Sequence, residues 1–131
     1  MRLVTGVTDA GVMTTLSTPP IDLGDLDRAL TRIAEVIGAD RVRTDTATIE
    51  EFRDPYTAQG SADWDASAVV SPTSTEEVQA VVRIAGECRV PLWTFSQGRN
   101  NTYGGPAPRV KGSVVVNLRE MNKVLEIDED L

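Results

Sequence analysis

A strand–helix–strand pattern in the middle of the sequence is the feature that most constrains the fold. Residues 66–70 and 90–95 form two short apolar runs, and apolar residues at helical spacing lie between them. Ser74, with Glu77 three positions later, fits a capping box at the start of that helix. This βαβ pattern predicts two parallel strands in a fold that mixes helices and strands.

Further elements flank this unit. An amphipathic helix is predicted over 23–37, ending at Gly38, and a short helix capped by Asp45 over 46–52. The predicted strands are 41–43, 112–118 and 123–127, the last two joined as a hairpin. The fold class expected is α+β, with the βαβ unit and a small mixed sheet between flanking helices. Residues 1–20 show no period and are expected to form a flexible leader before one domain over 21–131.

The composition excludes several classes of function. The 131 residues carry 13 Lys and Arg against 20 Asp and Glu, a net charge of −7, so we expect no nucleic-acid partner and no membrane partner. The absence of His removes Ser-His-Asp and Cys-His catalysis and imidazole metal sites, and no metal is expected. Cys88, the single cysteine, excludes an internal disulfide and is predicted to be buried. Without a signal-peptide pattern, the expected location is cytoplasmic.

The loop after the second predicted strand carries the chemistry. It reads Ser-Gln-Gly-Arg-Asn-Asn-Thr-Tyr-Gly-Gly-Pro over residues 96–106, and ligands of α/β folds bind beyond the carboxyl ends of parallel strands. Gly98 permits close approach of the backbone, and Arg99 offers a planar, charged fork for phosphate oxygens. These features suit a diphosphate, although the loop matches neither a Walker A motif nor a Rossmann fingerprint. An ordinary Gly- and Asn-rich surface connection is the alternative.

Residues 91–100 and 103–109 resemble the vanillyl-alcohol oxidase and 4-cresol dehydrogenase family of flavoproteins, and the similarity extends to 66–79 and 112–125. The resemblance implies the N-terminal half of a PCMH-type FAD-binding domain, with FAD as cofactor. By position, it implies that the cofactor-binding residues are Ser96, Gln97, Gly98, Arg99, Asn100, Asn101 and Gly104.

The resemblance also implies an activity. Tyr103 falls on an active-site Tyr that holds the phenolate of a para-substituted phenol, whose benzylic carbon gives a hydride to the flavin. A packed loop aromatic is the alternative role for Tyr103, and Thr102 stands where family members usually have Gly. Two other functions stay open: a truncated, non-catalytic FAD- or nucleotide-binding module, and an FAD-dependent oxidoreductase of a hydroxy acid or a sugar.

The family fold has two domains and is several times longer than 131 residues. The resemblance therefore implies an enzyme only as a full-length protein, with this chain inactive alone. The implied partners are a small phenolic substrate and either a second copy of the protein or an electron-accepting cytochrome. The exact substrate, the choice between oxidase and dehydrogenase, and the FAD linkage depend on residues beyond this sequence.

Overall fold

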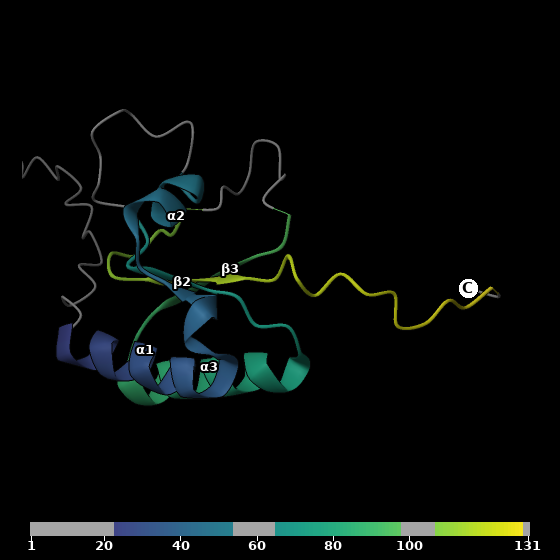
Figure 1. Ribbon diagram of the computed structural model, residues 1–131, viewed down its shortest axis with the longest axis horizontal. Coiled ribbons are helices and arrows are strands. Elements are labelled where there is room, and N and C mark those ends of the chain that lie inside the picture. The colour runs from purple at the N-terminus through teal and green to yellow at the C-terminus, as the bar shows by residue number, and fades with distance from the viewer. Residues whose placement is uncertain (1–22, 54–64, 98–106, 130–131) are drawn as a thin grey trace, which may run out of the picture.

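The computed structural model describes residues 23–53, 65–97 and 107–129, so the predicted leader lies outside the described residues. These three stretches form a four-stranded mixed sheet with helices on both faces (Figure 1). The strands are β1 (Val42–Arg43), β2 (Ala68–Val70), β3 (Leu92–Phe95) and β4 (Val114–Asn117). The α+β class predicted from the sequence is confirmed.

The sheet has the order β1-β2-β4-β3, with β1 antiparallel to β2 and the other pairs parallel. The two strands of the predicted βαβ unit, β2 and β3, are parallel as expected. They are not neighbours, however, because β4 lies between them. The three valines of β4 are buried on both faces of the sheet, which suits a central strand. Both edges of β4 are paired, one with β2 and the other with β3.

Two helices cover one face of the sheet, and Figure 1 shows them side by side below it. α1 (Leu23–Ile37) ends at Gly38, whose φ of 97° is a conformation that favours glycine. α3 (Thr75–Cys88) is the predicted crossover helix. The apolar stripes of the two helices pack on alternate residues of the strands and form one core. Cys88 is buried in this core, as predicted. The largest fully buried side chains of the core include Ile33, Ile37, Val70, Val81 and Val114.

The opposite face carries a smaller core beneath α2 (Thr46–Glu51). Asp45 caps this helix as predicted, because its side chain accepts the Thr48 backbone N–H. Phe52 follows the helix and packs with Ala66, Val69, Phe95 and Val115, and Trp93 covers the edge of this cluster.

The start of α3 corrects one detail of the sequence analysis. Ser74 caps the helix by accepting the Glu77 N–H at 3.2 Å. A capping box also requires the Glu77 side chain to accept the Ser74 backbone N–H, and it does not do so. The Glu77 carboxylate instead accepts the Thr73 N–H at 2.7 Å and one hydrogen bond from each terminal nitrogen of the Arg41 guanidinium. Arg41 closes the 3₁₀ turn η1 (Ala39–Arg41), so this pair ties the chain before β1 to the start of α3.

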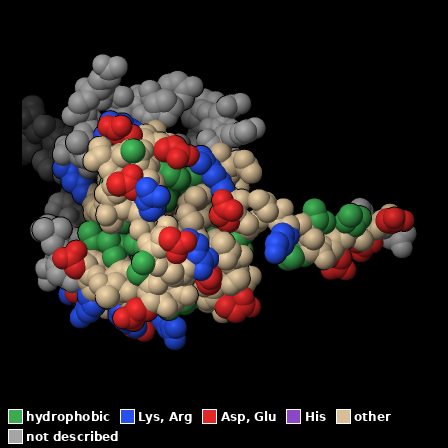
Figure 2. All heavy atoms as spheres, in the orientation of Figure 1, with side chains coloured by type: hydrophobic (Ala, Val, Ile, Leu, Met, Phe, Trp, Pro, Cys, Tyr) green, Lys and Arg blue, Asp and Glu red, His purple; other side chains and the backbone are tan. Residues whose placement is uncertain are grey.

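The predicted hairpin between 112–118 and 123–127 is wrong. Only the first segment is a strand, and residues 121–128 have no helix or strand. Both edges of β4 already pair with β2 and β3, so a hairpin partner has no backbone groups left to bind. The segment instead extends away from the sheet, and Val124, Leu125 and Ile127 are 76%, 94% and 78% exposed (Figure 2).

Within the three described stretches, every helix is too short or too polar to cross a lipid bilayer.

Candidate functional site

The carboxyl ends of β2, β4 and β3 meet at one edge of the sheet. The parallel register pairs Val70 with Val116 and Phe95 with Asn117. Ser71, the first residue after β2, therefore lies at the level of Asn117, and Ser96 follows directly after Phe95. Because a ligand site of a parallel sheet forms at this edge, these positions define the candidate site.

Asn117 connects the strand ends through both atoms of its side-chain amide. Its Nδ2 donates to Ser71 Oγ at 3.1 Å, which joins β4 to the end of β2. Its Oδ1 accepts the Arg119 backbone N–H at 3.1 Å, which turns the chain after β4. The Leu118 N–H continues the parallel ladder by donating to the Phe95 carbonyl at 3.0 Å. The edge is thus held by hydrogen bonds across all three parallel strands.

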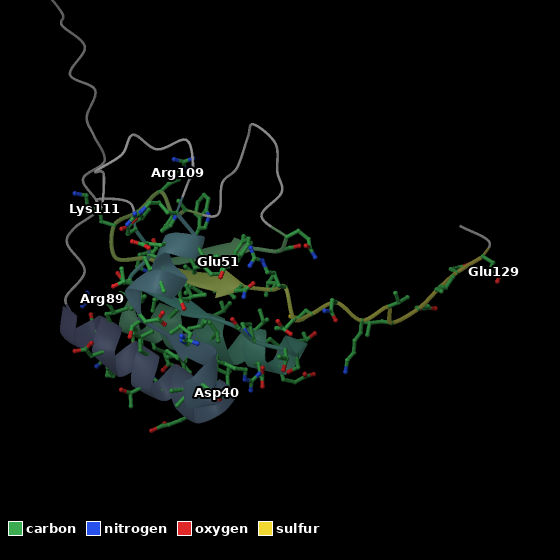
Figure 3. The ribbon with its side chains drawn as sticks, turned by 45° about the horizontal axis from the view of Figure 1, so that its top comes forward. Asp40, Glu51, Arg89, Arg109, Lys111 and Glu129 are labelled. Atoms are coloured by element: carbon green, nitrogen blue, oxygen red, sulfur yellow. The ribbon has the colours of Figure 1, made fainter. Side chains whose placement is uncertain are left out.

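Arg119 brings the smaller core to the same edge. Its guanidinium carbon lies 5.0 Å from the ring centroid of Phe95 and 5.3 Å from that of Phe52. The two rings meet edge to face, with centroids 4.9 Å apart and planes at 81°. Arg119 also forms an ion pair with Glu51 on α2, a residue that Figure 3 labels.

Two carboxylates near this edge, those of Glu77 and Glu51, are engaged by arginines. Glu77 accepts hydrogen bonds from Arg41 and from the Thr73 backbone, and these bonds lower the pKa of its carboxyl to about 2. Glu51 is paired with Arg119. An anion that approaches the strand ends therefore meets two carboxylates that already have arginine partners, together with neutral hydroxyl and amide donors.

Of the residues predicted to bind a cofactor, Ser96 and Gln97 are described, and both are exposed directly after β3. Gly98, Arg99, Asn100, Asn101 and Gly104, and the predicted catalytic residue Tyr103, lie outside the described residues. Figure 3 shows Arg109 and Lys111 on the side of the molecule where β4 begins, away from the segment that leads to Glu129. These two cations are therefore not at the carboxyl edge.

Sequence reasoning missed Ser71, Asn117 and Arg119 as parts of the site. A signal was present for the first two, because each is the first polar residue after a buried run of valines. Polar residues at that position mark the carboxyl end of a parallel strand. Arg119 carried no such signal, since its partners Phe52 and Glu51 are nearly 70 positions earlier in the sequence.

Residues 66–131 match the family profile described as "FAD binding domain", which is about half of the chain and includes β2, α3, β3, β4 and the candidate edge. The chain belongs to this family of FAD-binding domains. The cofactor of the family is FAD, as the sequence predicted. The observed architecture agrees with the PCMH-type FAD-binding domains among solved structures, which confirms the predicted fold.

Two curated relatives and one solved structure illustrate the similarity of this FAD-binding domain. The 4-cresol dehydrogenase [hydroxylating] flavoprotein subunit of Pseudomonas putida is 33% identical over 108 residues, 82% of this chain and 21% of that protein. The 1'-carboxy-chondrochloren decarboxylase of Chondromyces crocatus is 39% identical over 106 residues, 81% of this chain and 19% of that protein. The 4-ethylphenol oxidase of Gulosibacter chungangensis, solved with isoeugenol, has a TM-score of 0.79 and 40% identity over 86% of this chain and 22% of that chain.

The chain thus spans about a fifth of the length of the curated relatives that it matches. The residues at the carboxyl edge fit the diphosphate of FAD. Ser71, Asn117, Ser96 and Gln97 all carry neutral side chains able to donate hydrogen bonds, and two carboxylates near them, Glu77 and Glu51, are paired with arginines. Within the described ranges, no group of three or more His, Cys, Asp or Glu side chains could hold a metal ion.

Proposed function

We propose that the chain is the first half of the FAD-binding domain of a larger oxidoreductase that acts on para-substituted phenols. The observation that carries this proposal is the similarity to proteins whose names specify such phenols, 4-cresol dehydrogenase and 4-ethylphenol oxidase, over more than four-fifths of the chain. In this proposal, residues 21–131 form the partial domain, and the rest of the flavin domain and the substrate cap belong to the complete protein.

The diphosphate of FAD is proposed to lie at the carboxyl edge. Ser96 and Gln97 leave β3 there, and the loop that they begin continues with Gly98, Arg99, Asn100, Asn101 and Gly104. Backbone and side-chain N–H groups of a Gly-containing loop bind phosphate oxygens, and Arg99 adds a planar cation. Replacement of Arg99 by Ala should therefore weaken FAD binding by roughly tenfold or more, because a charge-assisted hydrogen bond is lost.

Tyr103 is proposed as the catalytic residue that contacts the substrate. Its hydroxyl hydrogen-bonds the phenolate oxygen and so favours the ionised form of the substrate over the neutral phenol. The oxyanion donates electron density toward the para carbon, which favours loss of hydride from the benzylic carbon. Bound FAD supplies the acceptor for that hydride. The chain's own contribution is to hold the oxygen and to orient the ring.

Anaerobic reduction of the bound flavin tests this proposal in the complete protein. Addition of 4-ethylphenol should bleach the flavin absorbance near 450 nm, and Tyr103→Phe should slow the bleaching by roughly 10²-fold with FAD still bound. Tyr56→Phe removes the other tyrosine hydroxyl of the chain and should leave the rate unchanged. Equal rates in the Tyr103 variant and the wild type would remove Tyr103 from the reaction.

The same assay separates the alternatives. Rapid bleaching by a 2-hydroxy acid, and none by a phenol, would favour the hydroxy-acid oxidoreductase. FAD binding without bleaching by either compound would favour the non-catalytic module. A decarboxylase is a further activity found among the relatives, and release of CO₂ from a carboxylated phenol substrate would identify it.

The proposed partners follow from the same family. The P. putida relative is named a flavoprotein subunit, so an electron-accepting protein is one proposed partner, and a second copy of the protein is the other. We also propose a cytoplasmic location, which agrees with the buried, free thiol of Cys88.

A further inference from the structure

Arg119 has contacts that the proposed function does not use. Its side chain contacts α2, Phe52 and the last residue of β3 together. Its side chain is 37% exposed, so solvent reaches one side of it while the other side lies against the two rings. The cluster formed by Glu51, Phe52, Phe95 and Arg119 is called the Arg119 cluster below.

The cluster fixes the point from which the loop begins. The ring of Phe95 contacts both the Phe52 ring, at 4.9 Å, and the Arg119 guanidinium, at 5.0 Å, and the last two are themselves 5.3 Å apart. Its carbonyl is held separately by the Leu118 N–H at 3.0 Å. Both the side chain and the backbone of Phe95 are therefore restrained by residues 118–119, immediately before Ser96 and Gln97 leave the sheet.

The backbone of Arg119 is itself anchored. Asn117 accepts its N–H and also bonds Ser71, so the position of Arg119 depends on the ends of β4 and β2. The guanidinium is already engaged by Glu51 and by the two rings, which leaves it fewer N–H groups to donate to a phosphate. Its planar group suits contact with aromatic rings, which the compact ammonium of a lysine does not reproduce.

We propose that Arg119 is a positioning residue of the FAD site, which holds Phe95 and thereby directs Ser96 and Gln97 toward the cofactor's diphosphate. The proposal rests on the proposed FAD site at the carboxyl edge. Arg119 acts through Phe95 and makes no contact with the phosphates. The shape of its side chain therefore matters more than its charge.

The test is FAD titration of the complete apoprotein, at a temperature where circular dichroism shows each variant to be folded. Arg119→Lys keeps the charge and Arg119→Gln removes it, and both should weaken FAD binding by a similar factor of about ten. Arg83→Gln removes an equal charge from the exposed side of α3 and should bind FAD as the wild type does. Phe95→Leu removes the ring that Arg119 contacts, and the double variant Arg119→Lys/Phe95→Leu should lose about tenfold rather than a hundredfold.

The outcomes are distinct. Absence of FAD binding by the wild type would overturn the proposed function. Normal binding by the wild type and by both Arg119 variants would overturn only the positioning role. Retained affinity in Arg119→Lys with a loss in Arg119→Gln would show a role of charge, and an additive hundredfold loss in the double variant would show that Arg119 does not act through Phe95; either result contradicts the proposal. Should Phe95→Leu not fold, the comparison of the two Arg119 variants still decides it.

Discussion

The two faces of the sheet are built differently. The face beneath α1 and α3 packs aliphatic side chains from two long helices, and its buried residues include Ile33, Ile37 and Val81. The face beneath α2 has few buried residues, and an arginine lies against its two phenylalanines. The first face holds most of the buried apolar residues of the two cores, whereas the second face includes Phe95, the residue before the loop begins. Substitutions on the two faces should therefore change different properties.

The largest effect on stability is expected from substitutions on the face covered by α1 and α3. Ile33 on α1 is fully buried, so Ile33→Ala should lower the free energy of unfolding of the apoprotein by about 2–5 kcal/mol, as measured by urea unfolding. The affinity of the folded protein for FAD should not change. Val36 on the same helix is 45% exposed, and Val36→Ala should cost only a few tenths of a kcal/mol. A loss of FAD affinity in folded Ile33→Ala would break the distinction between the two faces.

A smaller loss of stability and a change in binding are expected together on the face beneath α2. Phe52→Leu removes the ring that meets Phe95 and Arg119, which should cost about 2 kcal/mol in urea unfolding. It should also weaken FAD binding several-fold in titrations of the folded protein. Ala47→Ser, at an exposed position of α2, is the matched control and should change neither property. An unchanged affinity in Phe52→Leu would mean that this face is as independent of the cofactor as the other.

The start of α3 should give the smallest effect, with a defined pH dependence. The folded-state pKa of Glu77 is about 2, below its usual value of 4.5, so its bonds stabilise the protein above about pH 4.5 and that stability is lost as the pH falls toward 2. Glu77→Gln should cost roughly 1 kcal/mol at pH 7 and reduce the fall in stability between pH 5 and 2. Glu76→Gln, at the exposed neighbour, should leave the pH profile unchanged. If the stability of Glu77→Gln depended on pH in the same way as that of the wild type, the assigned pairing with Arg41 would be contradicted.

Local signals predicted most of the fold. Periodicity gave α1 and α3, the caps Asp45 and Ser74 were placed correctly, and Gly38 ended α1 as expected. The insertion of β4 between β2 and β3 was not predicted, because strand order depends on pairing between segments distant in sequence. The strand predicted over 123–127 failed for the same reason: its apolar residues suit a strand, but β4, its expected hairpin partner, already pairs with β2 and β3.

The place of two candidate residues in the fold was predicted, and their role in binding stays a prediction. The strand–loop pattern located Ser96 and Gln97 at the carboxyl edge, because the position of a loop relative to parallel strands follows from the order of the elements. The roles of Asn117 and Arg119 could not be read in the same way. Their partners Ser71, Phe52 and Glu51 come from other elements, and only the folded arrangement brings them together.

The central claim is that the loop beginning at Ser96 binds the diphosphate of FAD. The direct test is to titrate the complete apoprotein with FAD and with riboflavin, which has the same flavin ring but lacks the diphosphate and the adenosine, so that Arg99→Ala serves to isolate the part due to the diphosphate. Binding of FAD should be tighter by at least roughly tenfold, and Arg99→Ala should reduce that difference without changing the affinity for riboflavin. Equal affinities for the two ligands, or an unchanged difference in Arg99→Ala, would contradict the account.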